Sequence, residues 1–524
     1  MAPSTDSSKE DRASLEKEEK HSHAAAVAVD EVDTAATIAA GVHGDIDPAE
    51  ALRIRKKIDW HILPLMCTLY FIQFMDKSTL GSAAILGIRT EAHLTANQYN
   101  WLGTIFYLSY LVFEFPQNLA LQRFPVAKWM SLNIFVWGVA LASHAACKSF
   151  KGLFAVRFVL GMCEGSITAG FMIVTSMFYT RKEQALRVGY WFLMNGTALI
   201  ISGFISFGTL HIKTTKLEPW QWLMLITGML TLVTAVVFWF FFPDSPTSAW
   251  FLTPEERAIA VLRIKANQTG IENKHFKKEQ MFEALWDPKT WLFALAAAFA
   301  QVPNSLTNQG LIIISSFGFS ILDTTLLSCV VGVAEILIIW GSVSLVARTG
   351  SRAWVSIACY IPAIMSVILL TKLPPTNRVG LLCSLLVTLF YVPPFVIELA
   401  WISSVTAGHT KRITTNAIVL SAYCIGNASG PFMWQARYQP RDRVPWTVNG
   451  VCFAAGIFVI LALRYMLIAE NKRRDAEPPS DDPYAEVYTT RLATDGSGVT
   501  EKVRVDKEFL DLTDRQNRDF RYVY

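Results

Sequence analysis

The chain has 524 residues, of which 52% are hydrophobic and only 17% charged, and its mean hydropathy is +0.33. An average soluble chain carries roughly 25% charged residues, so this composition excludes an ordinary soluble domain. A formal net charge of +4 is too small to indicate a nucleic-acid-binding protein. The eight cysteines include no CxxC pair and the nine histidines no zinc-like spacing, so we expect neither disulfides nor a metal or other cofactor.

Apolar stretches dominate the chain between about residues 60 and 468. A hydrocarbon core of ~30 Å requires ~20 residues of helix, and each stretch comes close to that length. The sequence therefore predicts an all-α polytopic membrane protein with twelve transmembrane helices. The stretches are 60–80, 99–119, 126–146, 153–177, 187–209, 221–242, 290–312, 324–346, 353–371, 379–402, 413–435 and 446–468.

The longest polar interruption between them, 243–289, follows the sixth stretch. It divides the chain into an N-terminal six-helix bundle, 51–242, and a C-terminal six-helix bundle, 290–468. Residues 1–50 show no signal-peptide pattern, and with the Pro-rich, charged residues 469–524 they are predicted to be disordered tails. Two six-helix halves around a central site are typical of secondary transporters.

Lysine and arginine are more frequent in the loops on one predicted side of the membrane, which also carries 243–289 and both tails. The positive-inside rule assigns that side to the cytosol. We therefore expect a multi-pass protein, in the plasma membrane, with both termini and the central loop cytosolic.

Seven charged residues fall within the predicted helices. Such a charge costs at least ~2.5–3.5 kcal/mol at a helix centre, so each is a functional candidate. Two cations could bind an anionic substrate and five carboxylates could carry a proton. They are Lys77 and Arg157, and Asp76, Glu114, Glu164, Glu335 and Glu398.

Arg157 and Glu164 are seven residues apart, which places them on one helical face ~10 Å apart along the axis. A pore-lining face with both signs of charge could bind an anion and a proton in the same cavity. The alternative is a buried ion pair that only stabilises the bundle.

Asp76 and Lys77 are adjacent, so their side chains diverge by ~100°, and one could face the cavity while the other faces a neighbouring helix. Alternatively, the helix has already reached the interface and both are solvated. Glu114 precedes Pro116, which is expected to end the second helix, so a role in gate geometry is as plausible as proton binding. The lone carboxylates in the eighth and tenth helices are either proton sites or partners of a buried cation.

Neutral polar residues supply the remainder of a predicted cavity. In the seventh stretch, PNSLTNQG, Pro303 and Gly310 weaken the helix. Broken helices near the membrane midplane are common at transporter sites. The amide and phenol side chains expected to bind substrate are Asn304, Asn308, Tyr423 and Asn427.

Four strings carry a family resemblance: FMDKSTLGSAAILGI (74–88), YLSYLVFEFPQNLALQRF (107–124), RFVLGMCEGSITAGFMIVTSMFYTRKEQALRVGYW (157–191) and HTKRITTNAIVLSAYCIGNASGPF (409–432). Over about residues 50–470 the chain resembles the major facilitator superfamily, and within it the fungal anion:cation symporters of the allantoate permease group. The resemblance implies proton-coupled uptake of a small organic anion by alternating access. Allantoate, ureidosuccinate and nicotinate-like carboxylates are the implied substrates.

The superfamily's gating loop motif is only partly present after the second and eighth predicted helices, because its acidic residue is missing in both loops. The resemblance implies gating roles for Arg123, Glu183, Arg187, Arg348 and Arg352. The fifth predicted helix lacks the G-P-x-x-G-G element of proton-driven drug exporters, which favours uptake.

Two alternatives remain: an exporter of a secondary metabolite or toxin from a biosynthetic gene cluster, and a nutrient sensor that signals through its tails. An enzyme is not expected, because no nucleophile, P-loop or metalloprotease motif is present. The expected partners are a small organic anion, a proton and the lipid bilayer, and we expect a monomer.

Overall fold

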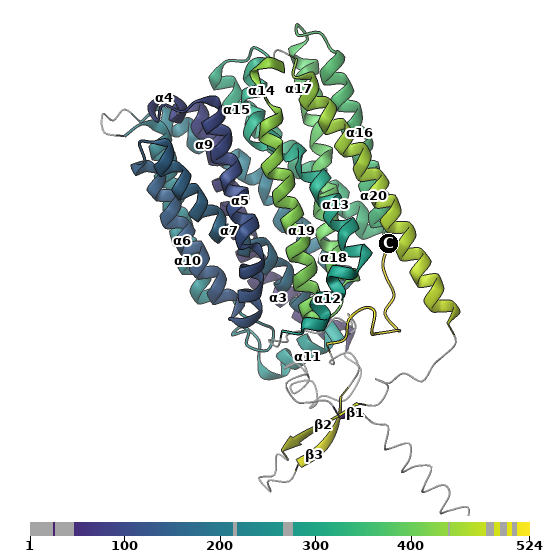
Figure 1. Cartoon of the computed structure of the whole chain (residues 1–524). Helices are drawn as coiled ribbons and strands as arrows, with labels where there is room; N and C mark the ends of the chain where they lie inside the picture. Colours follow the sequence, from purple (N-terminus) through teal and green to yellow (C-terminus); the bar gives the residue numbers. More distant parts are fainter. Residues whose placement is uncertain are drawn as a thin grey trace, which may run out of the picture.

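The computed structural model describes residues 25–26, 47–212, 217–265, 276–438, 441–477, 487–492, 500–505 and 511–524. Long helices that run side by side form the body of the protein (Figure 1). They confirm the predicted all-α class of polytopic membrane protein, with its two six-helix halves.

The N-terminal half begins with a long helix that starts where Asp47 caps it, accepting a hydrogen bond from the backbone N–H of Ala49 at 3.0 Å. A capping box between Thr95 and Gln98 starts the second spanning helix in the same way. The helices of this half are α3 (Pro48–Ile85), α4 (Ile88–Glu91), α5 (Ala96–Arg123), α6 (Val126–Ser143), η2 (His144–Ala146), α7 (Phe150–Phe178), α8 (Arg181–Phe192), α9 (Met194–Leu210) and α10 (Pro219–Phe241).

In the described part of the C-terminal half, short 3₁₀ turns interrupt two of the predicted helices, between α13 and α14 and between α17 and α18. Pro303 cannot donate a backbone hydrogen bond, and the seventh predicted helix is divided there, as expected; it continues through Gly310 without a break. The elements are α13 (Pro288–Gln301), η3 (Pro303–Ser305), α14 (Leu306–Ser316), α15 (Ile321–Thr349), α16 (Arg352–Lys372), α17 (Arg378–Thr388), η4 (Leu389–Tyr391), α18 (Val392–Val405), α19 (His409–Ser429), η5 (Gly430–Met433), η6 (Ala436–Tyr438) and α20 (Arg443–Ala476).

Two short helices, α11 (Pro254–Lys265) and α12 (Lys278–Trp286), lie in the central loop at one end of the bundle (Figure 1). We call this end, which also carries residues 511–524, the tail face. Strands β1 (Ala25–Ala26), β2 (Val487–Leu492) and β3 (Thr500–Val505) form a small sheet in the order β1-β2-β3. β1 pairs with β2 in parallel and β2 with β3 antiparallel, with Val487 opposite Val505.

Within the described residues, nine helical segments are long and apolar enough to cross a bilayer by length and composition. The other three of the twelve predicted spans are α5, the interrupted α13–α14 pair and α19, which carry more polar side chains. In Figure 1 they run alongside the nine segments. Across the two halves, α5 packs against α19 and α9 against α15.

Three local expectations differ from the structure. Pro116 does not end the second helix, since α5 continues to Arg123; a proline inside a helix can be accommodated by a kink. In the expected C-terminal tail, α20 extends to Ala476 and residues 511–524 pack against the tail face instead of being disordered. Most of the expected N-terminal tail lies outside the described residues, although α3 already begins at Pro48.

Candidate functional site

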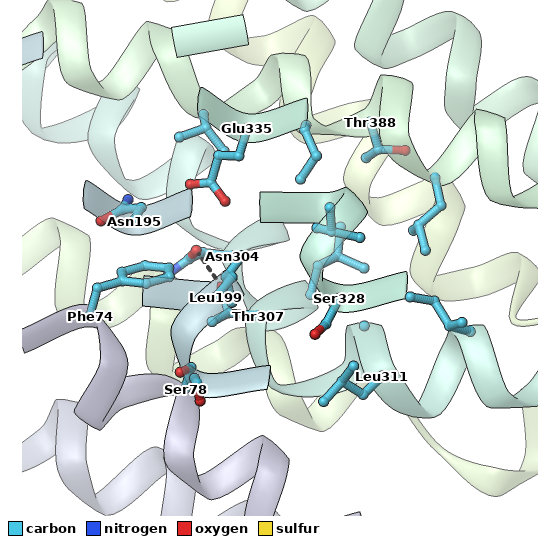
Figure 2. Close-up of a pocket in the computed structure, with 18 of the residues that line it drawn as sticks. Phe74, Ser78, Asn195, Leu199, Asn304, Thr307, Leu311, Ser328, Glu335 and Thr388 are labelled. Carbon is cyan, nitrogen blue, oxygen red and sulfur yellow. Dashed lines mark hydrogen bonds between the residues drawn. The ribbon is translucent and has the colours of Figure 1, made fainter. Parts of the chain in front are cut away.

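A cavity of about 110 Å³ lies between the two halves, and a second cavity of about 50 Å³ adjoins it. Figure 2 shows Asn195 and Phe74 on one side of the larger cavity and Glu335 and Thr388 on another. One water occupies roughly 10–15 Å³ of such volume, so the two cavities together would hold on the order of ten waters or one small molecule. The side chains that line both include Phe74, Asn195, Asn304, Thr307 and Tyr391.

The larger cavity continues away from the tail face. A third cavity of about 20 Å³ shares Ser82, Gly203 and Ser328 with it and reaches Ile85, the last residue of α3. These three cavities therefore form a row from the centre of the bundle toward the face opposite the tails, whereas a separate, more open cavity of about 300 Å³ lies against Met281 and Leu285 of α12.

The most prominent charges beside the cavity are Lys77 and Glu164. The Lys77 ammonium lies 2.9 Å from a carboxylate oxygen of Glu164, and the Glu164 side chain is fully buried. Lys77 lines the smaller cavity and lies 5.9 Å from the ring centres of both Phe106 and Tyr423. Aromatic faces at this distance favour a cation, so the ammonium is held at the cavity wall by one carboxylate and two rings.

Asp76 points away from this ion pair. Its carboxylate accepts a hydrogen bond from the Thr231 hydroxyl of α10 at 2.7 Å, inside the N-terminal half. The neighbours Asp76 and Lys77 thus diverge as expected: one faces a helix and the other faces the cavity. Neither is a solvated residue at a membrane interface, since Asp76 is fully buried and the Lys77 side chain is only 13% exposed.

Arg157 occupies the core of the N-terminal half, where it is 2% exposed. It lines none of the described cavities, and its Nε and Nη2 atoms have no hydrogen-bond partner within the described part of the chain. The ion partner that the structure gives Glu164 is Lys77. The shared helical face of Arg157 and Glu164 therefore does not bring the arginine to the cavity.

The other three carboxylates lie in different surroundings. Glu335 of α15 lines the larger cavity, and Figure 2 shows its carboxylate pointing into it. Glu114 is buried in α5, where the Asn118 amide donates to it at 2.6 Å. Glu398 is buried in α18 and lines none of the described cavities. Only Glu335 of these three reaches the cavity wall.

The predicted amides form a connected wall. Asn304 donates to the Asn427 side chain at 2.7 Å and accepts from the hydroxyls of Thr307 at 3.0 Å and Tyr391 at 3.3 Å. Asn427 also donates to the Gln301 side chain at 3.2 Å. Asn304 lines both cavities, whereas Asn427 stands behind it and holds its orientation.

Asn308 and Tyr423 line the smaller cavity, as predicted. Tyr423 stacks on Phe395 with ring centres 5.3 Å apart, and a Cβ added at Gly81 of α3 would lie 3.5 Å from the backbone oxygen of Asn308 in α14. The prediction missed Asn195, Thr307 and Tyr391, although each is a polar side chain within an apolar stretch. A polar side chain within an apolar stretch is a weak indication of a binding site, because such side chains often only contribute to helix packing.

Two of the five predicted gating residues, Arg187 and Glu183, form ion pairs near the tail face. Arg187 binds Asp59 of α3 through two hydrogen bonds of 2.7 and 3.2 Å, and Glu183 pairs with Arg263 of α11 at 3.0 Å. The two therefore pair with α3 and α11, which sequence reasoning did not identify. Arg123 and Arg348 are exposed and Arg352 is buried at the start of α16.

The two halves meet directly at the tail face. Arg412 of α19 donates to the Ser176 hydroxyl of α7 at 2.7 Å, and Gln122 of α5 donates to the Thr410 hydroxyl at 3.1 Å. At a second helix pair between the halves, Gly189 of α8 packs directly against Val343 of α15. These contacts close the tail side of the central cavity.

The sequence of this chain matches the family model of the Major Facilitator Superfamily over residues 66–431. The chain belongs to this superfamily. It is 35% identical to "Thiamine pathway transporter THI73" of Saccharomyces cerevisiae, an alignment that covers 90% of this chain and 86% of the relative. It is also 32% identical to "Allantoate permease" of the same yeast, covering 91% and 88% of the two chains. It is a transporter of this superfamily and not an enzyme.

The superfamily fold is shared with a solved structure of the proton:xylose symporter XylE bound to 6-bromo-6-deoxy-D-glucose. The TM-score is 0.62 and the identity 13%, over 80% of this chain and 96% of that one. At this identity the likeness concerns the fold alone. It agrees with the helical architecture.

Proposed function

We propose that this chain is a plasma-membrane, proton-coupled importer of a small organic anion, which acts as a monomer by alternating access of its two halves. The tail face is cytosolic in this proposal, because the loops there carry more lysine and arginine. Allantoate is the first candidate substrate, since a relative that is 32% identical is named for it. Ureidosuccinate and nicotinate-like carboxylates follow.

The Lys77–Glu164 ion pair at the cavity wall is the observation that carries this proposal. In a water-poor site, one ammonium beside two carboxylates leaves an uncompensated negative charge, which is costly. A substrate carboxylate can therefore bind Lys77 at low cost only when Glu164 takes up a proton. Release of the anion restores the original pair when Glu164 loses that proton. This exchange couples one proton to each monoanion.

The closed tail side is the arrangement in which an importer would receive its substrate. Arg412 on Ser176 and Gln122 on Thr410 close the tail side, while the row of cavities extends toward the opposite face. In the proposed orientation, a substrate would enter from outside the cell and leave after the tail-face contacts break.

Two measurements test the proposal. A growth screen on single organic-anion nutrients, with cells that express the chain, selects a labelled substrate. Purified protein in proteoliposomes should then accumulate that anion when the outside is acidic, and a protonophore should abolish the accumulation. Uptake that is the same with and without the proton gradient would contradict the proposal. Net export of the anion driven by that gradient would contradict it as well.

Glu164→Gln separates coupling from binding, because the amide keeps the shape of the carboxylate but cannot release a proton. This variant should lose uphill accumulation and retain exchange of labelled for unlabelled substrate. Normal accumulation per molecule in Glu164→Gln would remove Glu164 from the coupling mechanism.

A further inference from the structure

Residues 511–524 form a packed segment on the tail face. Asp511, Thr513, Asp514, Asn517 and Phe520 are at most 2% exposed. The segment contacts α12, the loop between α18 and α19, and α20, all of which belong to or adjoin the C-terminal half. A segment rich in charged residues is buried here because the surface supplies complementary charges.

Asp511 caps α19. The N-cap residue of that helix is Gly408, which has no side chain to satisfy the first free N–H groups. The Asp511 carboxylate accepts from the backbone N–H of His409 at 2.6 Å instead. A carboxylate at a helix N-terminus also interacts favourably with the helix dipole. The first turn of α19 thus depends on a residue about a hundred positions away in the sequence.

Asp514 lies between two buried lysines. Its carboxylate oxygens are 2.7 Å from the ammonium of Lys289 and 2.8 Å from that of Lys411, and its side chain is fully buried. Removal of one partner from such a site leaves the others buried without compensation, which is strongly destabilising. Asp514 therefore ties the segment to α13 and α19 together.

The segment is also fastened to α20 and α18. Arg474 donates to the backbone oxygens of Asp514 at 3.0 Å and Phe520 at 2.9 Å. The indole of Trp401 donates to the backbone oxygen of Val523 at 2.7 Å. Docking is therefore continuous from one end of the segment to the other.

The same first turn of α19 makes the contact between the halves, through Thr410 and Arg412. We propose that residues 511–524 are an intramolecular latch, which holds this turn against the N-terminal half and keeps the tail-face gate closed until the segment undocks. The occupant of this docking surface is the chain's own segment. The inference rests on the proposed function only in taking the tail face as cytosolic.

A cysteine at position 172 reports the state of this gate. Met172 is buried in α7, four residues from Thr168, which lines the cavity, and four from Ser176, which contacts Arg412. It therefore lies on the row of α7 between the cavity and the gate. A membrane-impermeant maleimide added to the tail side of inside-out vesicles should label Met172→Cys slowly.

Asp511→Ala and Asp514→Asn, each combined with Met172→Cys, should raise that labelling severalfold over the parent. Arg521→Ala is the matched control in the same segment, because its pair with Asp475 is exposed and worth little; it should label as the parent does. Labelling of the native cysteines is measured in the same chains without the Met172→Cys substitution and is subtracted. Unchanged labelling in the double variant Asp511→Ala/Asp514→Asn, with normal protein amounts, would overturn the latch.

If those variants do not fold, a protease site inserted within residues 506–510 allows the segment to be cut from the folded chain without removing β3, which pairs with β2. Removal of the cut segment should raise labelling, and a synthetic 511–524 peptide should reverse the increase, whereas its Asp514→Asn form should not. A labelling rate that neither peptide changes would contradict the latch. This readout needs neither substrate nor proton gradient, so its failure leaves the transport proposal standing, and failed transport leaves the latch standing.

Discussion

Lys77 of α3 and Glu164 of α7 form a 2.9 Å ion pair in which the lysine lines the cavity and the glutamate is fully buried behind it. The cation is thus available to a substrate, and its resident partner is shielded from water. An incoming anion would compete with Glu164 for the same ammonium.

Lys77→Met should abolish accumulation of the anion and lower the amount of folded protein, because it leaves the Glu164 carboxylate buried without its cation. The double variant Lys77→Met/Glu164→Gln removes both charges, so it should recover the protein amount without recovering accumulation. Surface protein and transport measured on the same cells would distinguish the two effects. Full accumulation in the double variant would exclude Lys77 as the anion site.

Arg157→Gln should reduce the amount of folded protein but leave transport per molecule within about twofold of the parent, because Arg157 lies in the core and lines none of the described cavities. The control is Lys151→Gln, an exposed position on the same helix, which should change neither quantity. A normal protein amount with lost transport would instead show that Arg157 acts in the cycle.

Glu335→Gln should alter the apparent KM or the substrate preference, because this carboxylate faces the larger cavity. Glu398→Gln is the matched substitution at a buried glutamate of the same half that lines none of the described cavities, and it should leave KM unchanged. Competition of unlabelled anions against labelled uptake measures both. Equal effects of the two variants would argue against a direct contact between Glu335 and substrate.

Gly196→Ala should lower stability, whereas Gly208→Ala should not. A Cβ at Gly196 would lie 2.2 Å from the Gly332 backbone oxygen, so α9 and α15 would have to separate. At Gly208, on the same helix, nothing lies within 4 Å, and alanine gains about 1 kcal/mol of helix propensity. Thermal unfolding in detergent should show a lower Tm for the first and an equal or higher Tm for the second.

The contribution of Asp514 to docking of the 511–524 segment should be the same at pH 8 and at pH 5. Burial by itself would raise the pKa of the Asp514 carboxyl, but Lys289 and Lys411 outweigh it and hold that pKa well below its usual range. The docking contribution of Asp514 is therefore complete above its ordinary pKa near 3.8 and is lost only as pH falls through the lowered value. Asp287, beside the same lysines, has its pKa lowered in the same sense.

Asp511 shifts the other way, because burial raises its pKa despite Lys277. Its docked form holds a proton more tightly than its free form, so acidification favours docking at this residue. Burial lowers the pKa of His409, which contacts Asp511, to about 3, so acid can weaken docking through this histidine. The measurement is therefore a ratio: the affinity of the synthetic 511–524 peptide for the cut chain over that of its Asp514→Asn form, by fluorescence anisotropy, should be the same at pH 8 and pH 5. A tenfold smaller ratio at pH 5 would contradict the assignment of Asp514.

The sequence by itself determined the helical class, the division into halves and the divergence of Asp76 from Lys77. Each of these follows from local properties: the length of an apolar stretch and the ~100° rotation between successive helical residues. The break at Pro303 was equally local, because proline removes a backbone donor wherever it stands in a helix.

Only the tertiary structure decided which partner each charge has. Helical spacing paired Arg157 with Glu164, but the packing of α3 against α7 placed Lys77 beside that glutamate and left Arg157 in the core. Residues 511–524 resembled a solvated tail, since charged side chains are stable in water until a complementary surface exists. That surface is formed by Lys289, Lys411 and Arg474, which lie far apart in the chain and meet only when the C-terminal half has folded.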